Sequence, residues 1–136
     1  MNITVSLAQG RVPVTILQVH GDLDASSYTD LIAKGQAVYN AGARDILLDL
    51  GDLSYISSSG LVALHRVALI VRGEKPSDPE PGWAAFHAID RDRDTGLQQH
   101  VKLLNLQPRV DTVLQTVGFK QFFEVHTDLA TAIASF

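Results

Sequence analysis

Apolar and polar residues alternate at the start of the chain, and a run of β-branched and apolar residues follows. Ile3, Val5 and Leu7 alternate with polar neighbours, and residues 13–20 form the second run. Alternation is typical of a half-buried strand, and β-branched residues favour strands. Because a short turn at residues 9–11 separates the two runs, the pattern predicts an N-terminal β-hairpin.

Two helices and a buried strand are predicted next. The first helix starts at Asp24, Ser26 and Ser27, carries Leu31, Ile32, Gly35 and Val38 on one face, and ends at Gly42. Residues 45–50 predict a buried strand, because their Ile-Leu-Leu core has the near-continuous apolar character of a strand covered on both faces of its sheet. Residues 61–71 then predict a helix that is apolar on almost all sides. We expect such a helix to be deeply buried or to present its outer face to a partner.

Residues 73–99 interrupt this alternation of helices and strands. Three of the five prolines lie in residues 73–82, which predicts a loop, and residues 83–89 are a candidate short strand. Beyond the interruption, strands are predicted at 101–106 and 122–125, a helix at 108–117, and a last helix that starts at Thr127 and Asp128 with Leu129, Ile133 and Phe136 on one face.

This order of elements predicts an α/β fold. Strands that alternate with helices imply parallel crossover connections, so we expect a mixed, mostly parallel β-sheet with an N-terminal hairpin and about four helices. A length of 136 residues suits one domain, and 46% hydrophobic residues supply a core. We therefore predict a single domain, 1–136, in which residues 73–99 are an insertion.

Charge and cysteine content exclude several classes of protein. Eleven Lys and Arg against fifteen Asp and Glu give a formal charge of −4, the wrong sign for a dedicated nucleic-acid binder. The absence of cysteine excludes disulfides, thiolate zinc sites, iron–sulfur clusters and cysteine nucleophiles. The longest apolar run, residues 67–71, is far shorter than the ~20 residues of a membrane span. We expect a soluble, cytoplasmic protein with no membrane partner.

The segment between the buried strand and the apolar helix carries the candidate chemistry. Ser57, Ser58 and Ser59 follow one another at the predicted helix start, where free N–H groups and the helix dipole favour an anion. Phosphorylation there would add about −1.5 to −2 charges beside the helix. The alternative is that Ser57 or Ser58 is an N-cap that contributes about 1 kcal/mol. The residues alone favour the N-cap.

Four segments together resemble a known family. They are Gly-Asp-Leu-Asp at 21–24, Asp-Leu-Gly-Asp-Leu-Ser at 49–54, Ser-Ser-Ser-Gly-Leu at 57–61, and the stretch from Leu-Asn-Leu at 104–106 to Val-Gly-Phe at 117–119. These segments resemble the STAS domain family, which includes the C-termini of sulphate transporters and bacterial anti-sigma-factor antagonists. The resemblance covers residues 1–72 and 100–136.

The resemblance implies a phosphorylation site and a partner. In antagonists of this family, an anti-sigma factor serine kinase phosphorylates the first serine after a signature Asp, and only the unphosphorylated antagonist binds that kinase. That serine is Ser58 here, with Ser57 and Ser59 as alternative acceptors. Ser57 itself replaces the signature Asp. The resemblance also implies a partner-binding surface made of Asp24, Ser57, Ser58, Ser59, Gly60 and Leu61.

The predicted function is therefore a non-enzymatic, phosphorylation-dependent regulator with no cofactor, no metal and no direct contact with nucleic acid. The alternative is a STAS scaffold or ligand-binding module that no kinase modifies. A homodimer stays open. For Asp24, a cap on the first helix is an equal alternative to partner contact, and Asp52 is a candidate for an Asx-type role in its loop.

Other chemistries are less consistent with the sequence. Ser58 and His65 are about 10 Å apart along one helix and cannot form a catalytic pair. The alternating His20, Asp22 and Asp24 would share one side of an extended segment, but polarity at a strand end explains them better than a cation. Two features of the insertion are also set aside: Asp90, Asp92 and Asp94 lack the Gly and Glu of a calcium loop, and Trp83, Phe86 and His87 are more simply explained as anchors of the loop than as a partner patch.

Overall fold

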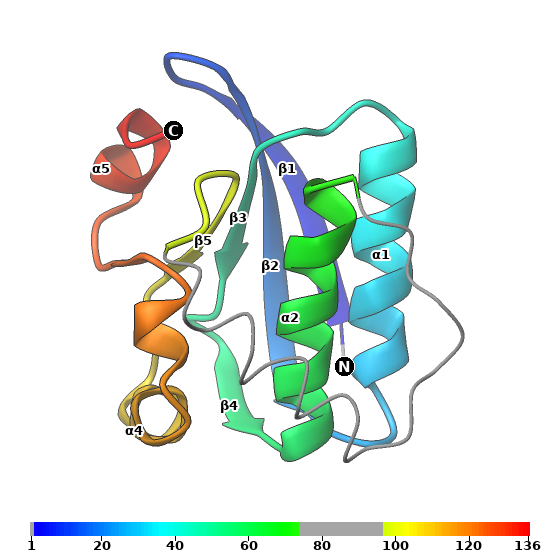
Figure 1. Ribbon diagram of the computed structural model, residues 1–136, viewed down its shortest axis with the longest axis vertical. Coiled ribbons are helices and arrows are strands. Elements are labelled where there is room, and N and C mark those ends of the chain that lie inside the picture. The colour runs from blue at the N-terminus through cyan, green and yellow to red at the C-terminus, as the bar shows by residue number, and fades with distance from the viewer. Residues whose placement is uncertain (1, 74–96) are drawn as a thin grey trace.

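The computed structural model describes residues 2–73 and 97–136, which form one mixed β-sheet with helices on both faces (Figure 1). The strands are β1 (Asn2–Gln9), β2 (Pro13–Leu23), β3 (Ile46–Asp49), β4 (Leu53–Ile56), β5 (Val101–Leu104) and β6 (Val125–His126). The helices are α1 (Tyr28–Asn40), α2 (Ser58–Val71), α4 (Pro108–Thr116) and α5 (Leu129–Ala134), with a 3₁₀ turn at Phe119–Gln121. No helix in the described ranges is long and apolar enough to cross a membrane.

The sheet confirms the predicted architecture. Its strand order is β1-β2-β3-β5-β6, and β4 pairs with β2 away from this path. The hairpin β1–β2 is antiparallel, whereas β2–β3, β3–β5, β5–β6 and β2–β4 are parallel. The parallel pairs follow from the helices that connect their strands, as the alternating pattern predicts.

Strand β2 supports two neighbours along its length. Residues 15–18 pair with β3, whereas residues 21–23 pair with β4. The register shifts between Gly21 and Asp22, where Gly21 has a φ of 94° that a side chain would strain. Because β4 leads directly into α2, the far end of β2 determines where α2 begins.

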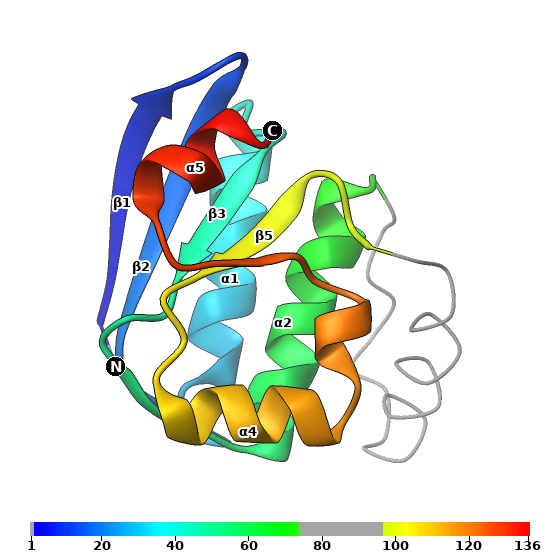
Figure 2. The same cartoon turned by 90° about the vertical axis from the view of Figure 1, so that its left-hand side faces the viewer.

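Helices α1 and α2 cover one face of the sheet, and α5 lies on the other face (Figure 2). The larger core cluster lies under α1 and α2 and includes Leu17, Leu48 and Leu64. A smaller cluster of Val14, Leu47, Leu104 and Ala132 lies under α5. α2 buries nine of its residues, which confirms its prediction as a deeply buried helix.

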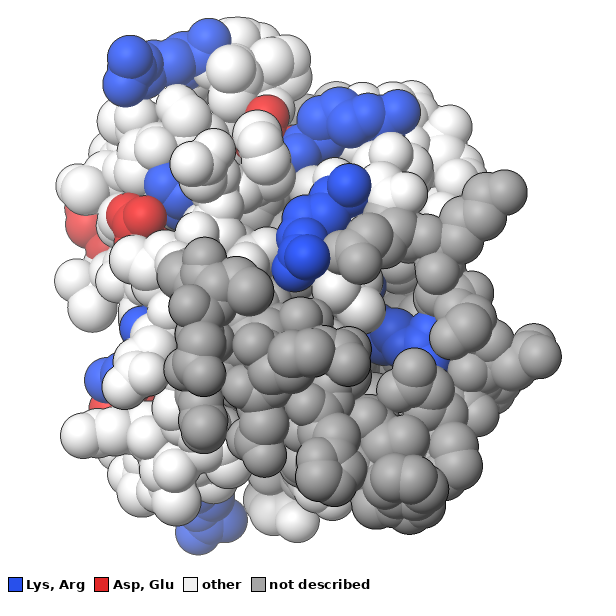
Figure 3. All heavy atoms as spheres, in the orientation of Figure 1, with Lys and Arg blue, Asp and Glu red and all other residues white. Residues whose placement is uncertain are grey.

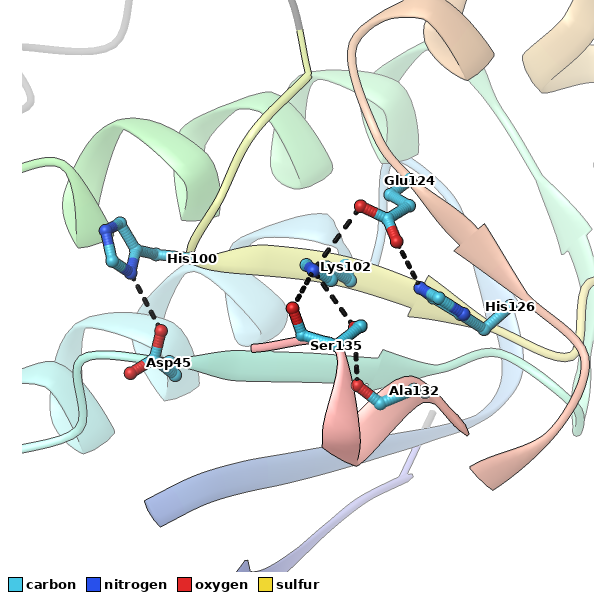
Figure 4. A network of polar contacts seen from close by, with 7 residues as sticks. All are labelled: Asp45, His100, Lys102, Glu124, His126, Ala132 and Ser135. Carbon is cyan, nitrogen blue, oxygen red and sulfur yellow. Dashed lines mark hydrogen bonds and ion pairs between the residues drawn. The ribbon is translucent and has the colours of Figure 1, made fainter. Parts of the chain in front are cut away.

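A buried lysine attaches α5 to the sheet (Figure 4). Lys102 on β5 is 5% exposed, and its Nζ donates hydrogen bonds to the carbonyl oxygen and the Oγ of Ser135, at 2.8 and 3.0 Å. The same Nζ lies 3.4 Å from Oε2 of Glu124. A buried ammonium must have its hydrogen bonds and charge satisfied. Here Ser135, the C-cap of α5, accepts the hydrogen bonds, and Glu124 supplies the opposite charge.

Three local predictions were wrong. The segment after residue 50 was treated as a loop, but it contains β4, whose burial pattern does not alternate. The predicted strand at 122–125 is shifted to Val125–His126, because the N–H groups of Phe122 and Phe123 close the 3₁₀ turn by donating to the carbonyl oxygen of Phe119. Leu129 does not share the buried face of α5, since it is 46% exposed. The candidate strand at 83–89 lies outside the described residues.

Candidate functional site

The serine triplet lies where β4 joins α2. Ser57 is the N-cap of α2, with φ −96° and ψ 178°, and its Oγ accepts a hydrogen bond from the backbone N–H of Gly60 at 3.3 Å. Ser58 and Ser59 are the first two residues of the helix. The N-cap prediction is therefore confirmed for Ser57, and the hydroxyl of Ser57 is engaged in the helix start.

Ser58 is the most exposed of the three serines. Ser58 is exposed, whereas Ser57 and Ser59 are half-buried. The first turn of α2 contains no acidic residue, so no side-chain carboxylate within that turn offsets the positive end of the helix dipole. Ser58 is thus an exposed residue in the first turn of a helix, where the backbone N–H groups and the helix dipole stabilise an anion.

Gly60 and Leu61 hold the first turn of α2 against the sheet. A Cβ atom on Gly60 would lie 2.6 Å from Cγ1 of Ile56 and 2.7 Å from the carbonyl oxygen of Leu23. Leu61 is buried in the main core. Both residues were predicted to contact the partner, and in the structure their side-chain positions face the protein interior. By packing there, Gly60 and Leu61 fix the position of the exposed Ser58.

Asp24 lies in the turn between β2 and α1, close to the same end of the sheet. Its Oδ1 accepts hydrogen bonds from the backbone N–H and the Oγ of Ser26, at 2.9 and 2.6 Å, and from the Oγ of Ser27 at 3.3 Å. The hydroxyl and N–H of Ser26, together with the Ser27 hydroxyl, hold the pKa of Asp24 below its ordinary value of 3.8. The side chain is therefore a carboxylate at neutral pH.

Asp24 is not the N-cap of α1, contrary to the capping alternative that the sequence predicts. The N-cap of α1 is Ser27, which makes no capping hydrogen bond with its side chain. Ser27 Oγ instead donates to the carbonyl oxygen of Asp22 at 2.8 Å and accepts from the N–H of Asp24 at 3.0 Å. Asp24 closes the turn before the helix rather than the helix itself.

The turn and the serine triplet meet at the end of β2. The N–H of Ser57 donates to the carbonyl oxygen of Leu23 at 2.9 Å, next to Asp24 in the chain. Figure 1 shows that α1 and α2 both begin at this edge of the sheet, near the end of β4. The carboxyl ends of parallel strands are where α/β proteins place their functional residues.

Two further residues complete the edge. Tyr55 on β4 is 42% exposed, two positions before Ser57. Sequence reasoning missed it because β4 itself was not predicted.

Asp49, at the end of β3, has the Asx-type role that the sequence predicts for Asp52. Its Oδ1 accepts a hydrogen bond from the N–H of Gly51 at 3.0 Å. Asp52 instead contacts Nδ1 of His20 at 2.9 Å.

The remaining candidates do not assemble a second site in the part of the chain that the structure describes. There, no group of three His, Asp or Glu side chains is placed to hold a metal ion, and His65 is buried against the ring of Phe122. On the described part of the face in Figure 3, basic side chains lie in separate patches rather than over one continuous surface. Residues 83–95, with their aromatic and acidic candidates, lie outside the described residues.

A family model described as "Mlab, STAS domain" matches residues 7–77, a range that includes both the Asp24 turn and the serine triplet. The chain belongs to the STAS domain family. The predicted resemblance is therefore confirmed.

Those relatives are anti-sigma factor antagonists by name. BtrV of Bordetella bronchiseptica, named as a candidate anti-sigma factor antagonist, is 28% identical over all of this chain and 95% of its own length. A crystal structure of a candidate antagonist from Thermotoga maritima matches with a TM-score of 0.70 at 14% identity, over 96% of this chain and 91% of that one.

Two further structures have the same fold. An anti-sigma factor antagonist from Mycobacterium paratuberculosis matches with a TM-score of 0.65 at 15% identity, over 98% of this chain and 93% of that one. The Bacillus cell fate determinant SpoIIAA in its phosphorylated form matches with a TM-score of 0.55 at 18% identity, over 97% and 96%. This STAS domain thus has the fold of anti-sigma factor antagonists.

Proposed function

We propose that this STAS domain is an anti-sigma factor antagonist that binds an anti-sigma factor serine kinase and is released when the kinase phosphorylates Ser58. It acts in the cytoplasm as a substrate and ligand of that kinase, not as an enzyme. The names of BtrV and of the structural neighbours support the class of partner. The observation that carries the proposal is the exposed Ser58 at the start of α2.

The geometry favours Ser58 over its two neighbours. The hydroxyl of Ser57 already accepts a hydrogen bond as the N-cap, and the residue is half-buried. Ser59 is half-buried as well. In the reaction, the Ser58 Oγ bonds to the γ-phosphorus of ATP, ADP leaves, and the hydroxyl proton passes to a base of the kinase. The antagonist needs only to present the hydroxyl.

The switch follows from electrostatics. A phosphate on Ser58 would carry about −1.5 to −2 charges and would be stabilised by the helix start, so α2 stays folded. The Asp24 carboxylate is ionised nearby, so the same edge becomes strongly anionic. A partner that packs around the unphosphorylated Ser58 would, after phosphorylation, face an unpaired dianion that is costly to desolvate.

One observation favours a second candidate function. Ser57 stands where the family signature has Asp, so a kinase that reads that carboxylate would not recognise this chain. Under this alternative the domain is a binding scaffold whose affinity for its partner does not depend on Ser58.

The test combines phosphorylation and binding. The purified domain is incubated with ATP and each anti-sigma serine kinase of its source organism, and the phosphate is located by mass spectrometry. We expect one phosphate, lost in Ser58→Ala and retained in Ser57→Ala and Ser59→Ala. If no kinase adds a phosphate to any of the three serines, the proposal is wrong.

Binding titrations separate the two functions. We expect Ser58→Glu to weaken kinase binding at least tenfold, whereas Ser54→Glu, at an exposed position on β4, leaves it within twofold. Equal affinities for wild type and Ser58→Glu would support the scaffold instead.

A further inference from the structure

The outer edge of β1 is an unprotected sheet edge. β1 is the first strand in the sheet order, and no described strand pairs with its outer side. Its eight residues, Asn2–Gln9, contain no charge and no proline. Proteins usually protect such an edge with charges, proline or a bulge, because its free N–H and C=O groups are a template for another strand.

The same strand exposes apolar side chains. Val5 is 42% exposed and Leu7 is 80% exposed, and Leu7 is the most exposed large hydrophobic residue in the described ranges. Leu7 pairs across the hairpin with Thr15, Val5 with Leu17, and Ile3 with Val19. Since Leu17 and Val19 belong to the core under α1 and α2, Ile3, Val5 and Leu7 lie on the α1 side of the sheet.

We propose that this edge binds the β1 strand of a second copy of the chain, so that two sheets continue into one across a two-fold axis at Val5. In this antiparallel register Val5 lies opposite Val5 of the second copy, and Leu7 lies opposite Ile3. On the other face, Thr4 lies opposite Ser6, and Asn2 opposite Ala8. Apolar residues meet apolar ones on the α1 side, and no like charges meet anywhere along the strand.

The surface beside β1 has room for the exposed leucine. A hollow of about 480 Å³ lies between the start of β1 and α1, and it is lined by Ile3, Ala33 and Ala37 together with the polar Asn2, Asp30 and Lys34. In the proposed register, Leu7 of the second copy comes next to Ile3 and therefore reaches this hollow. The two-fold axis gives the same contact twice, so both exposed leucines are covered.

A second copy explains the edge better than an unrelated strand does. Two β1 strands paired antiparallel about Val5 are related by a two-fold axis, as in an isologous interface, and the absence of charge on β1 lets the strand pair with itself without like-charge repulsion. The serine triplet belongs to β4 and α2, and β4 pairs with the far end of β2 and not with β1. The dimer therefore leaves Ser58 free in both copies, and its test does not depend on phosphorylation.

The decisive experiment uses charge reversal at the axis. We expect the wild-type domain to sediment as a dimer in analytical ultracentrifugation over a concentration series. Val5→Lys or Val5→Glu alone places two like charges face to face, and should raise the dimer dissociation constant at least about tenfold. Mixing the two variants should restore a dimer that contains one copy of each. That recovery also shows that neither variant has simply lost its fold.

Cross-linking checks the register. The chain has no native cysteine, so in Val5→Cys the introduced thiol can form a disulfide only with the same thiol of a second copy. Leu129→Cys is the matched control, because Leu129 is 46% exposed on the opposite layer. We expect a rapid disulfide dimer for Val5→Cys alone. The proposal is wrong if the wild type is a monomer, if the dimer survives Val5→Lys, or if both cysteine variants cross-link equally. A monomeric wild type would leave the edge of β1 for a strand from another protein.

Discussion

Gly60 at the start of α2 lies directly against the carbonyl oxygen of Leu23 at the end of β2, and a Cβ atom on Gly60 would come within 2.7 Å of that oxygen. The N–H of Ser57 donates to the same oxygen at 2.9 Å. One carbonyl group thus fixes both the N-cap and the first turn of α2. The position of the exposed Ser58 depends on this contact.

Gly60→Ala should therefore destabilise the domain. The added methyl group meets backbone on one side and Ile56 on the other, so we expect a loss of about 1–3 kcal/mol in the free energy of unfolding. Urea denaturation measures it. Ser58→Ala, in the same turn but exposed, should change stability by less than about 0.5 kcal/mol. A Gly60→Ala protein as stable as wild type would disprove the close contact.

The N-cap of α2 predicts opposite effects for two substitutions at one position. Ser57→Ala removes the acceptor of the Gly60 N–H and should cost about 1 kcal/mol in unfolding free energy. Ser57→Asp keeps an acceptor and adds a negative charge at the positive end of the helix, so it should be at least as stable as wild type. Chemical denaturation of the two variants in parallel checks the order, and an alanine variant equal to the aspartate variant would contradict it.

The Asp24 turn predicts a specific dependence on acid. The native pKa of Asp24 lies below the unfolded value of 3.8, so the unfolded chain binds more protons as the pH falls through this range. The stability that the carboxylate contributes is present above the unfolded pKa and is lost as the pH drops through the native pKa. Asp24→Asn should therefore be less stable than wild type near neutral pH, and this difference should shrink below pH 3.8.

The cause of that shift can be tested separately. Ser26 donates to Asp24 with both its hydroxyl and its N–H, and these are the two largest contributions. Ser26→Ala removes the hydroxyl, so the pKa of Asp24 should rise toward its ordinary value. An NMR titration of the carboxyl carbon measures this pKa directly. If it is unchanged in Ser26→Ala, another group lowers it.

The buried Lys102 predicts a strong polar attachment of the C-terminal helix, beside the apolar packing of Ala132. Lys102→Met removes two hydrogen bonds from a buried ammonium to Ser135, and should cost about 1.5–3 kcal/mol. Amide hydrogen exchange should accelerate most in α5. Lys120→Met is the matched control, because Lys120 pairs with Asp111 near the surface, where such a pair contributes at most about 1 kcal/mol. Equal losses of unfolding free energy in both variants would contradict a strong attachment of α5 through Lys102.

Tyr55 predicts an effect on binding without an effect on folding. Its ring is exposed beside the serine triplet, and exposed tyrosines are common among the residues that dominate binding energy. Tyr55→Ala should weaken binding of the proposed kinase at least about tenfold while the urea midpoint stays near that of wild type. Calorimetric titration against the same kinase measures the affinity. Leu129→Ala serves as an exposed apolar control on another surface.

The order and type of most helices and strands in this domain could be predicted from its sequence, because each element has its own local pattern of apolar and polar residues. The alternating Ile3, Val5 and Leu7, and the apolar run before Leu50, define strands whatever surrounds them. β4 could not be predicted in this way. Its four residues do not alternate, and it is a strand only because the end of β2 offers it a partner. Phe122 and Phe123 likewise look like a strand, but they serve as core side chains after a 3₁₀ turn.

The candidate site likewise contains features that the sequence predicts and features that only the folded structure shows. The helix start at Ser57 follows from residue types that cap helices, so it was predictable. The exposure of Ser58, the burial of Gly60 and the role of Asp49 depend on contacts between segments far apart in the chain. Asp52 and Asp49 are equally plausible in sequence, and only the bend after β3 decides between them.

Strand β2 belongs to two separate ladders, with β3 along residues 15–18 and with β4 along residues 21–23. The shifted register at Gly21 divides the ladders, yet Leu53 and Ile56 of the short ladder lie in the same buried core as Leu17 of the long one. The segment that presents Ser58 is therefore as rigid as the main core and does not melt on its own. A kinase must accept this serine on a folded helix start, so its active site has to fit the shape of the turn.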